Sequence, residues 1–174
     1  VQLFGEGNGV PQYTRHVDLC IDHHAGNSGY AEFTLLDGSA AAAAELLYEV
    51  ICAMHVEITP HIADCLYTGL STDTGCFRFS STKASTHITA AKLMEAGAHV
   101  EELNTLLFDT KPRERMEAER IARNHLEYHL DGRCALIYLT RDEIEQSRVD
   151  PADLEELTSL PISIEGVKVG LTLR

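Results

Sequence analysis

The segment that most constrains the fold is a short apolar run that ends abruptly in polar residues. Residues 17–24 read Val-Asp-Leu-Cys-Ile-Asp-His-His. A buried parallel strand is almost entirely apolar, and polar residues at its carboxyl end point toward the crevice where open α/β sheets bind ligands. Imidazole nitrogen and carboxylate oxygen suit divalent manganese, zinc, iron or cobalt. The run therefore predicts a metal site at the mouth of a parallel sheet, formed by His23, His24 and Asp22, or with Asp22 orienting a ring instead.

The plain alternative is that the two histidines are ordinary loop or core residues, and the residues alone leave both interpretations open. Side chains alternate along a strand, which places Cys20 on the opposite face from Leu19 and Ile21 and favours a small buried thiol over a zinc ligand. The cysteines are odd in number and lack any Cys-x-x-Cys pair, so we expect reduced, mostly buried thiols. They are Cys20, Cys52, Cys65, Cys76 and Cys134.

Composition narrows the class of partner. The 174 residues are 44% hydrophobic, enough for one domain or one domain and part of another. The formal charge of −13 argues against a broad grip on duplex DNA, which requires a basic surface, but a small phosphorylated substrate can still be held through a metal ion and a few arginines. No run approaches the roughly 20 apolar residues of a membrane span and no signal-peptide core opens the chain, so we expect a cytoplasmic protein that does not bind membranes.

The hydrophobic periodicity and the positions of glycine and proline predict alternating strands and helices. Residues 1–16 are polar and glycine-dotted, and we expect a loop there that follows upstream sequence not included in the chain. The expected strands are 17–24, 33–36 and 134–139, with a final hairpin of 162–165 and 167–173. The first expected helix begins at N-cap candidates within 37–39 and ends at Met54, and the second begins at Pro60 and ends in the segment 68–80. Further helices are expected over 84–97, 100–108, 113–130, 141–147 and 151–157. The start of the first helix is expected to offer a modest anion site.

A second motif lies at the end of the helix that Pro60 opens. Asp73 stands between Thr72 and Thr74, two residues before Gly75. Taken alone, this is most simply a capping or turn aspartate. Arg78 follows between two phenylalanines, where a rigid guanidinium could bind phosphate, or where it is an ordinary surface arginine.

Taken together, the two motifs resemble the DHH phosphoesterase family. Residues 22–24 (Asp-His-His), 66–69 (Leu-Tyr-Thr-Gly) and 73–78 (Asp-Thr-Gly-Cys-Phe-Arg) are similar in order and spacing to the branch of bacterial oligoribonucleases (nanoRNases) and 3′-phosphoadenosine-5′-phosphate (pAp) phosphatases. The Glu-Ala-Gly-Ala at 95–98 and the Pro-Ile-Ser-Ile-Glu-Gly-Val at 161–167 also resemble that branch.

The resemblance implies an α/β fold in three parts. Residues 1–110 would be the C-terminal part of a DHH catalytic domain with a parallel, Rossmann-like sheet. Residues 111–130, which open on Lys111-Pro112, would form a linker helix, and residues 131–174 the beginning of a smaller DHHA1-type substrate-binding domain. On this interpretation the chain is truncated at both ends.

The resemblance also implies a manganese-dependent phosphoesterase with two ions. His23 and Asp73 would be ligands of one ion, His24 would contact the phosphate or protonate the leaving oxygen, and Asp22 would orient its neighbours. Arg78 and Ser80 are extrapolated as phosphate contacts. The substrates would be short single-stranded oligoribonucleotides, pAp or pApA, and we expect a homodimer because an exposed edge of a parallel sheet needs cover.

Two departures from the family limit what the chain can do alone. The upstream His-x-x-x-Asp-x-Asp motif and a further aspartate are absent, as is the Gly-Gly-His loop, so too few ligands remain for a metal pair and we expect the chain by itself to be inactive. The alternatives are a pyrophosphatase or polyphosphatase of the same superfamily, and a non-catalytic relative that binds nucleotides.

Overall fold

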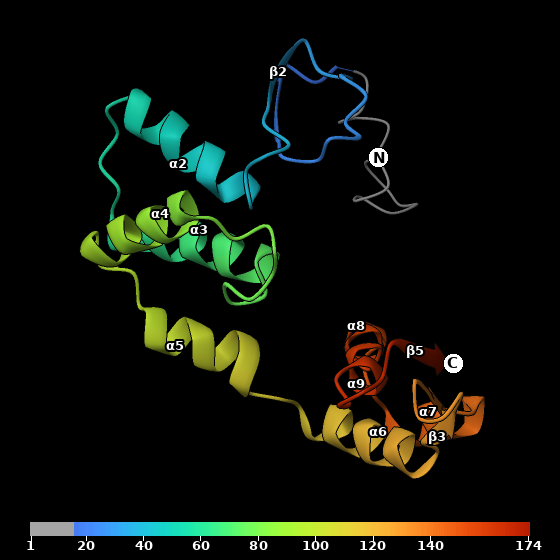
Figure 1. Cartoon of the computed structure of the whole chain (residues 1–174). Helices are drawn as coiled ribbons and strands as arrows, with labels where there is room; N and C mark the ends of the chain where they lie inside the picture. The colour runs from blue at the N-terminus through green and yellow to red at the C-terminus, as the bar shows by residue number, and fades with distance from the viewer. Residues whose placement is uncertain (1–15) are drawn as a thin grey trace. The chain divides into compact units, whose positions relative to one another are not determined.

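The computed structural model describes residues 16–174 and shows a mixed α/β protein (Figure 1). The chain divides into two compact units, Val1–Asp109 and Thr110–Arg174. The loop expected at residues 1–16 lies, except for His16, outside the described residues. Among residues 16–174, no helix is both long and apolar enough to cross a membrane.

The sheet of the first unit consists of two parallel strands, β1 (Leu19–Asp22) and β2 (Phe33–Leu36). Both strands lie where the sequence predicts them. Cys20 is buried, but Leu19 is 55% exposed and Phe33 is 65% exposed. The interpretation of β1 as a buried strand is therefore wrong for the residues that the structure describes, because α2 (Ala43–Ala53) is the helix that packs against it there and side chains of the sheet remain exposed.

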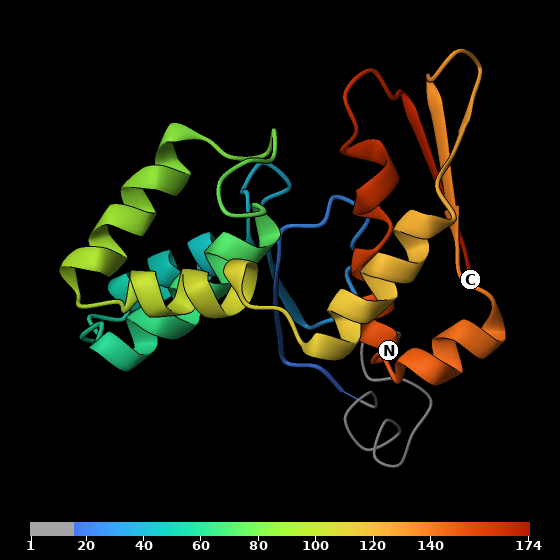
Figure 2. The ribbon, with the colours of Figure 1, turned by 90° about the horizontal axis from the view of Figure 1, so that it is seen from below.

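Four helical segments make up the rest of the first unit, and α2 packs against β1 (Figure 2). They are α2 (Ala43–Ala53), α3 (Pro60–Asp73), α4 (Ala84–Glu95) and α5 (Val100–Asn104), the last continuing as the π-helical turn η2 (Thr105–Asp109). Pro60 occupies the first turn of α3, where its missing N–H costs nothing, and the Thr59 hydroxyl accepts the N–H of Ile62. Buried side chains of α3 and α4, including Leu70 and Leu93, form the core that fixes these helices.

The start of α2 differs from the sequence prediction. Neither Asp37 nor Ser39 caps the helix, because Asp37 instead accepts the backbone N–H of Ser39 in a turn at 2.8 Å. The helix begins at Ala43, and the side chain of Glu45 folds back to accept the N–H of Ala41 at 2.7 Å. The carboxylate of Glu45 thus places a negative charge at this helix start, which disfavours the anion site that the sequence predicts there.

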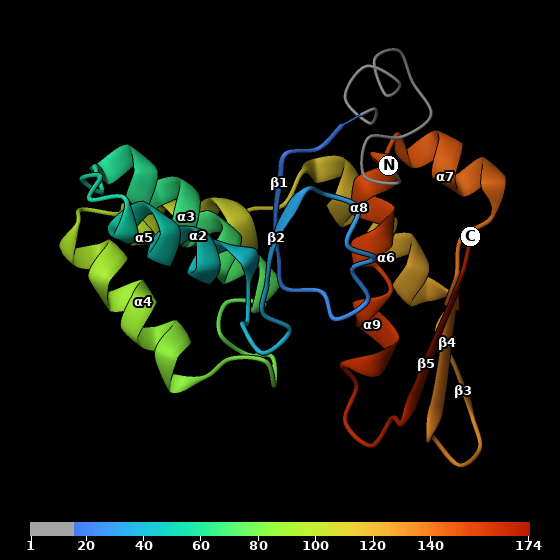
Figure 3. The same ribbon diagram turned by 90° about the horizontal axis from the view of Figure 1, so that it is seen from above.

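The second unit is built on a three-stranded mixed sheet with β4 in the centre (Figure 3). The strands are β3 (Glu127–His129), β4 (Cys134–Tyr138) and β5 (Val169–Leu173), and the helices are α6 (Arg113–Asn124), α7 (Arg141–Ser147), α8 (Pro151–Glu156) and α9 (Ser159–Ile162). β3 pairs antiparallel with β4, and β5 pairs parallel with it.

Two sequence predictions fail in this unit. The helix expected over 113–130 ends at Asn124, because residues 127–129 pair with β4 through a turn in which Leu130, Asp131 and Gly132 all have positive φ. The expected hairpin of 162–165 with 167–173 is absent: residues 159–162 are helical and β5 pairs with β4 instead. A Cβ on Gly170 would meet the backbone nitrogen of Ile162 at 2.8 Å, so this close approach of α9 to β5 requires glycine.

The cysteines are free but not mostly buried. Cys20 and Cys134 lie on strands and are buried, Cys76 is half-buried, and Cys52 and Cys65 are exposed on α2 and α3. The expectation of mostly buried thiols is therefore wrong, because an apolar sequence neighbourhood does not tell which face of a helix a residue occupies.

Candidate functional site

The carboxyl end of β1 carries the polar residues that the sequence singles out. β1 ends at Asp22, and His23 and His24 follow immediately. Because β1 and β2 are parallel, both strands end at the same edge of the sheet, and the N–H of Asp37 donates to the carbonyl of Asp22 there at 3.2 Å. This edge is where open α/β sheets bind ligands.

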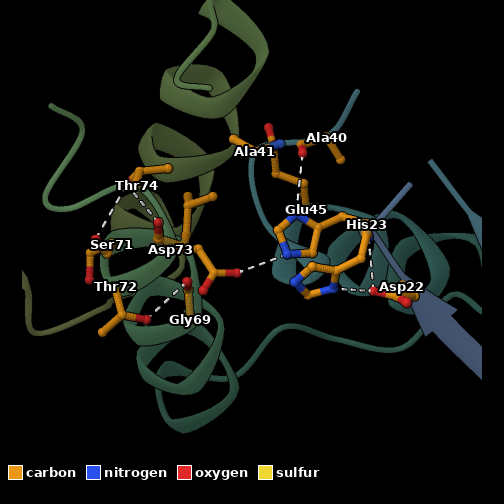
Figure 4. Close-up of polar contacts among 12 residues, drawn as sticks. Asp22, His23, Ala40, Ala41, Glu45, Gly69, Ser71, Thr72, Asp73 and Thr74 are labelled. Atoms are coloured by element: carbon orange, nitrogen blue, oxygen red, sulfur yellow. Dashed lines mark hydrogen bonds and ion pairs between the residues drawn. The ribbon is translucent and has the colours of Figure 1, made fainter. Parts of the chain in front are cut away.

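His23 is held between two acceptors. Its Nδ1 lies 3.4 Å from the carbonyl oxygen of Ala40, and its Nε2 lies 3.4 Å from Oδ2 of Asp73 (Figure 4). A carbonyl only accepts hydrogen bonds, so in the tautomer that donates from Nδ1 to Ala40, the lone pair of Nε2 faces the Asp73 carboxylate. In that tautomer, a metal ion between Nε2 and the carboxylate would be bound by both.

The end of helix α3 presents Asp73. The buried Thr74 hydroxyl donates to the carbonyl of Leu70 at 2.7 Å and accepts the N–H of Phe77 at 3.1 Å, so the chain reverses direction around it. Gly75 and the two residues after it all have positive φ. Asp73 therefore stands at the carboxyl end of a helix, where the helix dipole adds negative potential and favours a bound cation.

A hydrogen-bonded turn fixes Asp22 and His24. Oδ1 of Asp22 accepts the backbone N–H of His24 at 3.0 Å and lies 2.7 Å from Nδ1 of the same residue, while Oδ2 accepts Nδ2 of Asn27 at 2.6 Å. The Asn27 bond first, and then the two His24 bonds, hold the pKa of Asp22 well below its usual range. Asp22 is thus an ionised acceptor, and the side chain of His24 is 76% exposed.

The two residues extrapolated as phosphate contacts, Arg78 and Ser80, differ from the histidines in their contacts. Arg78 donates from Nε to the carbonyl of Gly75 at 2.6 Å, within its own turn. Ser80 is exposed on the segment that follows. The structure brings His23 and Asp73 together, but it shows no hydrogen bond or ion pair that joins Arg78 or Ser80 to them among the described residues.

Two contributors to the site were missed at the sequence level. The first is Asn27, which the sequence shows only as part of a small-residue turn; an asparagine two residues before Gly29 is the signal that could have indicated it. The second is the carbonyl of Ala40, which no sequence pattern could reveal because it depends on how the β2–α2 connection folds.

The metal-ligand set at this edge is small. Within residues 16–174, no third His, Cys, Asp or Glu joins His23 and Asp73 closely enough to complete a cluster. The described residues do bring His16, Asp18 and Glu32 together at the opposite end of the two strands, with His16 3.1 Å from Asp18 and 3.4 Å from Glu32. All three are exposed and form an ordinary surface ion-pair group.

Comparisons with known proteins place this geometry in context. No protein-family model matches the chain. The chain is 29% identical over 154 residues to the bifunctional oligoribonuclease and PAP phosphatase NrnA of Thermus thermophilus, a match that covers 88% of the chain and 46% of that protein. It is 24% identical over 155 residues to the NrnA of Bacillus subtilis, covering 85% and 48%.

A solved structure supports the same relationship. The crystal structure of an exopolyphosphatase-related protein from Bacteroides fragilis matches with a TM-score of 0.79 and 25% identity, covering 87% of this chain and 45% of that one. The chain therefore spans about half the length of the relatives that it matches.

Proposed function

This chain is a relative of the NrnA proteins in the DHH phosphoesterase family, and from that relationship we propose that it forms part of a metal-dependent enzyme that hydrolyses short oligoribonucleotides, pAp or pApA. The observation that carries the proposal is the convergence of His23 and Asp73, from distant parts of the sequence, to 3.4 Å. Its products are a nucleoside monophosphate or inorganic phosphate.

The spacing of these two side chains fits one metal ion. Ligand nitrogen and oxygen atoms lie about 2.0–2.2 Å from zinc and from similar divalent ions. Two atoms at such distances from one ion are about 2.8–3.6 Å apart when the angle at the metal is between a right angle and a tetrahedral one. The 3.4 Å between Nε2 of His23 and Oδ2 of Asp73 lies within this range.

Manganese is the proposed ion, because imidazole and carboxylate ligands together suit it. Two ligands hold an ion weakly, and a pair of ions needs further carboxylates. When bound, such ions lower the pKa of a coordinated water toward about 7 and clamp the attacking and leaving oxygens of a phosphoryl transfer.

The remaining residues have proposed roles of their own. His24 contacts the phosphate or gives a proton to the leaving oxygen through Nε2, and Asp22 holds its ring. Arg78 and Ser80, both exposed on the segment after Asp73, are proposed to contact the phosphate once substrate is present. The binding of short, single-stranded substrates agrees with the formal charge of −13, which disfavours long duplexes.

We propose a division of the chain into three parts of a DHH enzyme. Residues 1–110 would form the C-terminal part of the catalytic domain, residues 111–130, which include α6 and β3, the linker, and residues 131–174 the beginning of the substrate-binding domain. A homodimer is the proposed form, because the exposed apolar side chains of β1 and β2, such as Leu19 and Phe33, need cover.

The test is a hydrolysis assay of the protein that contains this chain. With manganese, we expect release of AMP from pApA and of phosphate from pAp. Because both substitutions remove a ligand, His23→Ala and Asp73→Asn should each lower the rate by more than about 100-fold and weaken manganese binding, which the paramagnetic resonance of free manganese measures independently.

A second histidine–aspartate pair in the first unit provides a matched control. Asp64 on α3 pairs with Nδ1 of His99 at 3.0 Å, about 13 Å along the helix axis from Asp73 at about 1.5 Å per residue. His99→Ala should keep full activity. Hydrolysis that persists unchanged in His23→Ala would contradict the proposed function.

A second candidate is hydrolysis of pyrophosphate or polyphosphate. It is favoured by the structural match to an exopolyphosphatase-related protein. The same assay separates the two, since phosphate release from pyrophosphate that exceeds release from pAp would select this alternative.

A further inference from the structure

The turn that follows His24 is organised around the side chain of Asn27. Its Oδ1 accepts the backbone N–H of Gly29 at 2.7 Å, and because a backbone N–H is only a donor, this contact fixes which end of the amide is oxygen. Nδ2 must then be the atom that faces Asp22, at 2.6 Å, and it also lies 3.4 Å from the sulfur of Cys20. The orientation of Asn27 is therefore set by the backbone.

The orientation of Asn27 sets that of Asp22 and, through it, the tautomer of His24. With Oδ2 held by Asn27, Oδ1 of Asp22 lies 2.7 Å from Nδ1 of His24 and accepts the backbone N–H of the same residue. An ionised carboxylate only accepts hydrogen bonds, so Nδ1 of His24 carries the proton. In the neutral ring, Nε2 then has the lone pair.

We propose that Asn27 is a positioning residue for the site: through Asp22 it holds His24 in the Nδ1–H tautomer, which leaves the lone pair of the neutral ring on Nε2. The catalytic meaning of this inference rests on the proposed function. A neutral histidine without such partners prefers the Nε2–H form, so Asn27 and Asp22 reverse the ordinary preference.

The side-chain ¹⁵N spectrum of the full chain tests this inference without metal or substrate. Long-range ¹H–¹⁵N correlations distinguish the two neutral tautomers, and they are recorded with a chelator at one mildly alkaline pH. We expect the Nδ1–H form for His24 in the native chain. Asn27→Asp keeps the size of the side chain but removes both donors, and Asn27→Ala removes them without adding charge; both should move His24 toward the Nε2–H form.

Ser28→Ala is the matched control, because Ser28 is exposed in the same turn and should leave His24 unchanged. Backbone amide spectra show whether each variant keeps the first unit folded. The Nε2–H form in the native chain would overturn the proposal even if both Asn27 variants failed to fold. An unchanged Nδ1–H form in a folded Asn27→Asp would also overturn it.

The hydrolysis assay separates this inference from the proposed function. If both hold, Asn27→Asp should lower kcat about 10- to 100-fold, as is usual when a residue that orients a catalytic group is lost. A protein that shows the tautomer change but hydrolyses none of the substrates supports the positioning of His24 by Asn27 and refutes the proposed function. A protein that is active, with His24 insensitive to Asn27→Asp, refutes the positioning role.

Discussion

At the scale of single residues, the turn after Asp73 carries backbone strain. Gly75, Cys76 and Phe77 have φ values of +56°, +57° and +62°. For a residue with a Cβ, this left-handed conformation costs about 1–2 kcal/mol. Thr74 offsets this cost, because its hydroxyl and its carbonyl both form hydrogen bonds within the turn. Strain that the surroundings enforce is common beside functional groups, and here it adjoins the proposed metal ligand.

Gly75→Ala tests how far this turn depends on glycine. The added Cβ would lie 2.5 Å from the ring of Phe79, in addition to the left-handed φ, so we expect a loss of about 2–4 kcal/mol in the free energy of unfolding, measured by urea denaturation.

Gly29→Ala is the control for the backbone cost alone. Its φ is +66°, but a Cβ there would meet nothing within 4 Å, so the loss should stay near about 1 kcal/mol. Equal losses for the two variants would contradict the steric argument at Gly75.

The residues of the site differ in how visible they are in the sequence. Asp22, His23 and His24 stand out because they interrupt an apolar strand at the end that faces a crevice. Glu45 does not stand out, since a glutamate in a helix is ordinary until the fold shows that it caps the backbone of Ala41. Contacts that join side chain to backbone across a turn depend on local geometry that residue type alone does not encode.

At the scale of elements, α6 is fixed by a buried carboxylate. Glu119 is 5% exposed, and Lys111 donates to it at 2.8 Å while Nε of Arg115 lies 3.4 Å away. Burial alone would raise the pKa of Glu119, but the hydrogen bond of Lys111 and the charges of Lys111 and Arg115 outweigh it, so the pKa is lowered. The ionised carboxylate therefore contributes to the stability of the second unit.

Glu119→Gln should change both the stability of this unit and its response to acid. Because the folded pKa lies below the unfolded value near 4.5, the stabilisation is complete above that pH and is lost as the pH falls through the folded pKa. The variant should be less stable at neutral pH by about 1–2 kcal/mol, the net value of a charged hydrogen bond. Its stability should also fall less steeply with pH below about 5.

Glu117→Gln on the same helix provides the comparison. Glu117 is paired with Arg120 at 2.6 and 2.9 Å but is exposed, so its loss should matter much less at neutral pH. Acid denaturation followed by circular dichroism measures both variants. A steeper acid dependence in Glu119→Gln would be incompatible with a lowered pKa.

Helix starts were more predictable than strand partners. Pro60 and Pro151 mark the first turns of α3 and α8 because proline suits that position, and the sequence shows it directly. Residues 127–129 continue a charged helical pattern, yet they form β3 because pairing with β4 satisfies their backbone. The parallel pairing of β5 with β4 likewise joins residues that are far apart in the sequence, and local periodicity cannot indicate it.

At the scale of the molecule, each unit closes its own core. The first contains Leu66, Leu70 and Leu93, and the second contains Ile137 and Leu157. The polar site residues belong to the first unit, and the buried Glu119 network belongs to the second. Site geometry and the stability of the second unit should therefore respond to different substitutions.

Leu93→Ala and Ile137→Ala form a reciprocal test of two separate cores. Both side chains are fully buried, so each substitution should cost about 2–5 kcal/mol through lost contacts and the cavity left behind. Native-state hydrogen exchange locates the loss: Leu93→Ala should reduce protection of the α3 and α4 amides but not of β4, and Ile137→Ala should do the reverse. If either substitution reduced protection in both units, the two units would unfold as one cooperative body. A defect in the core of one unit lowers protection in the other only when the two unfold together.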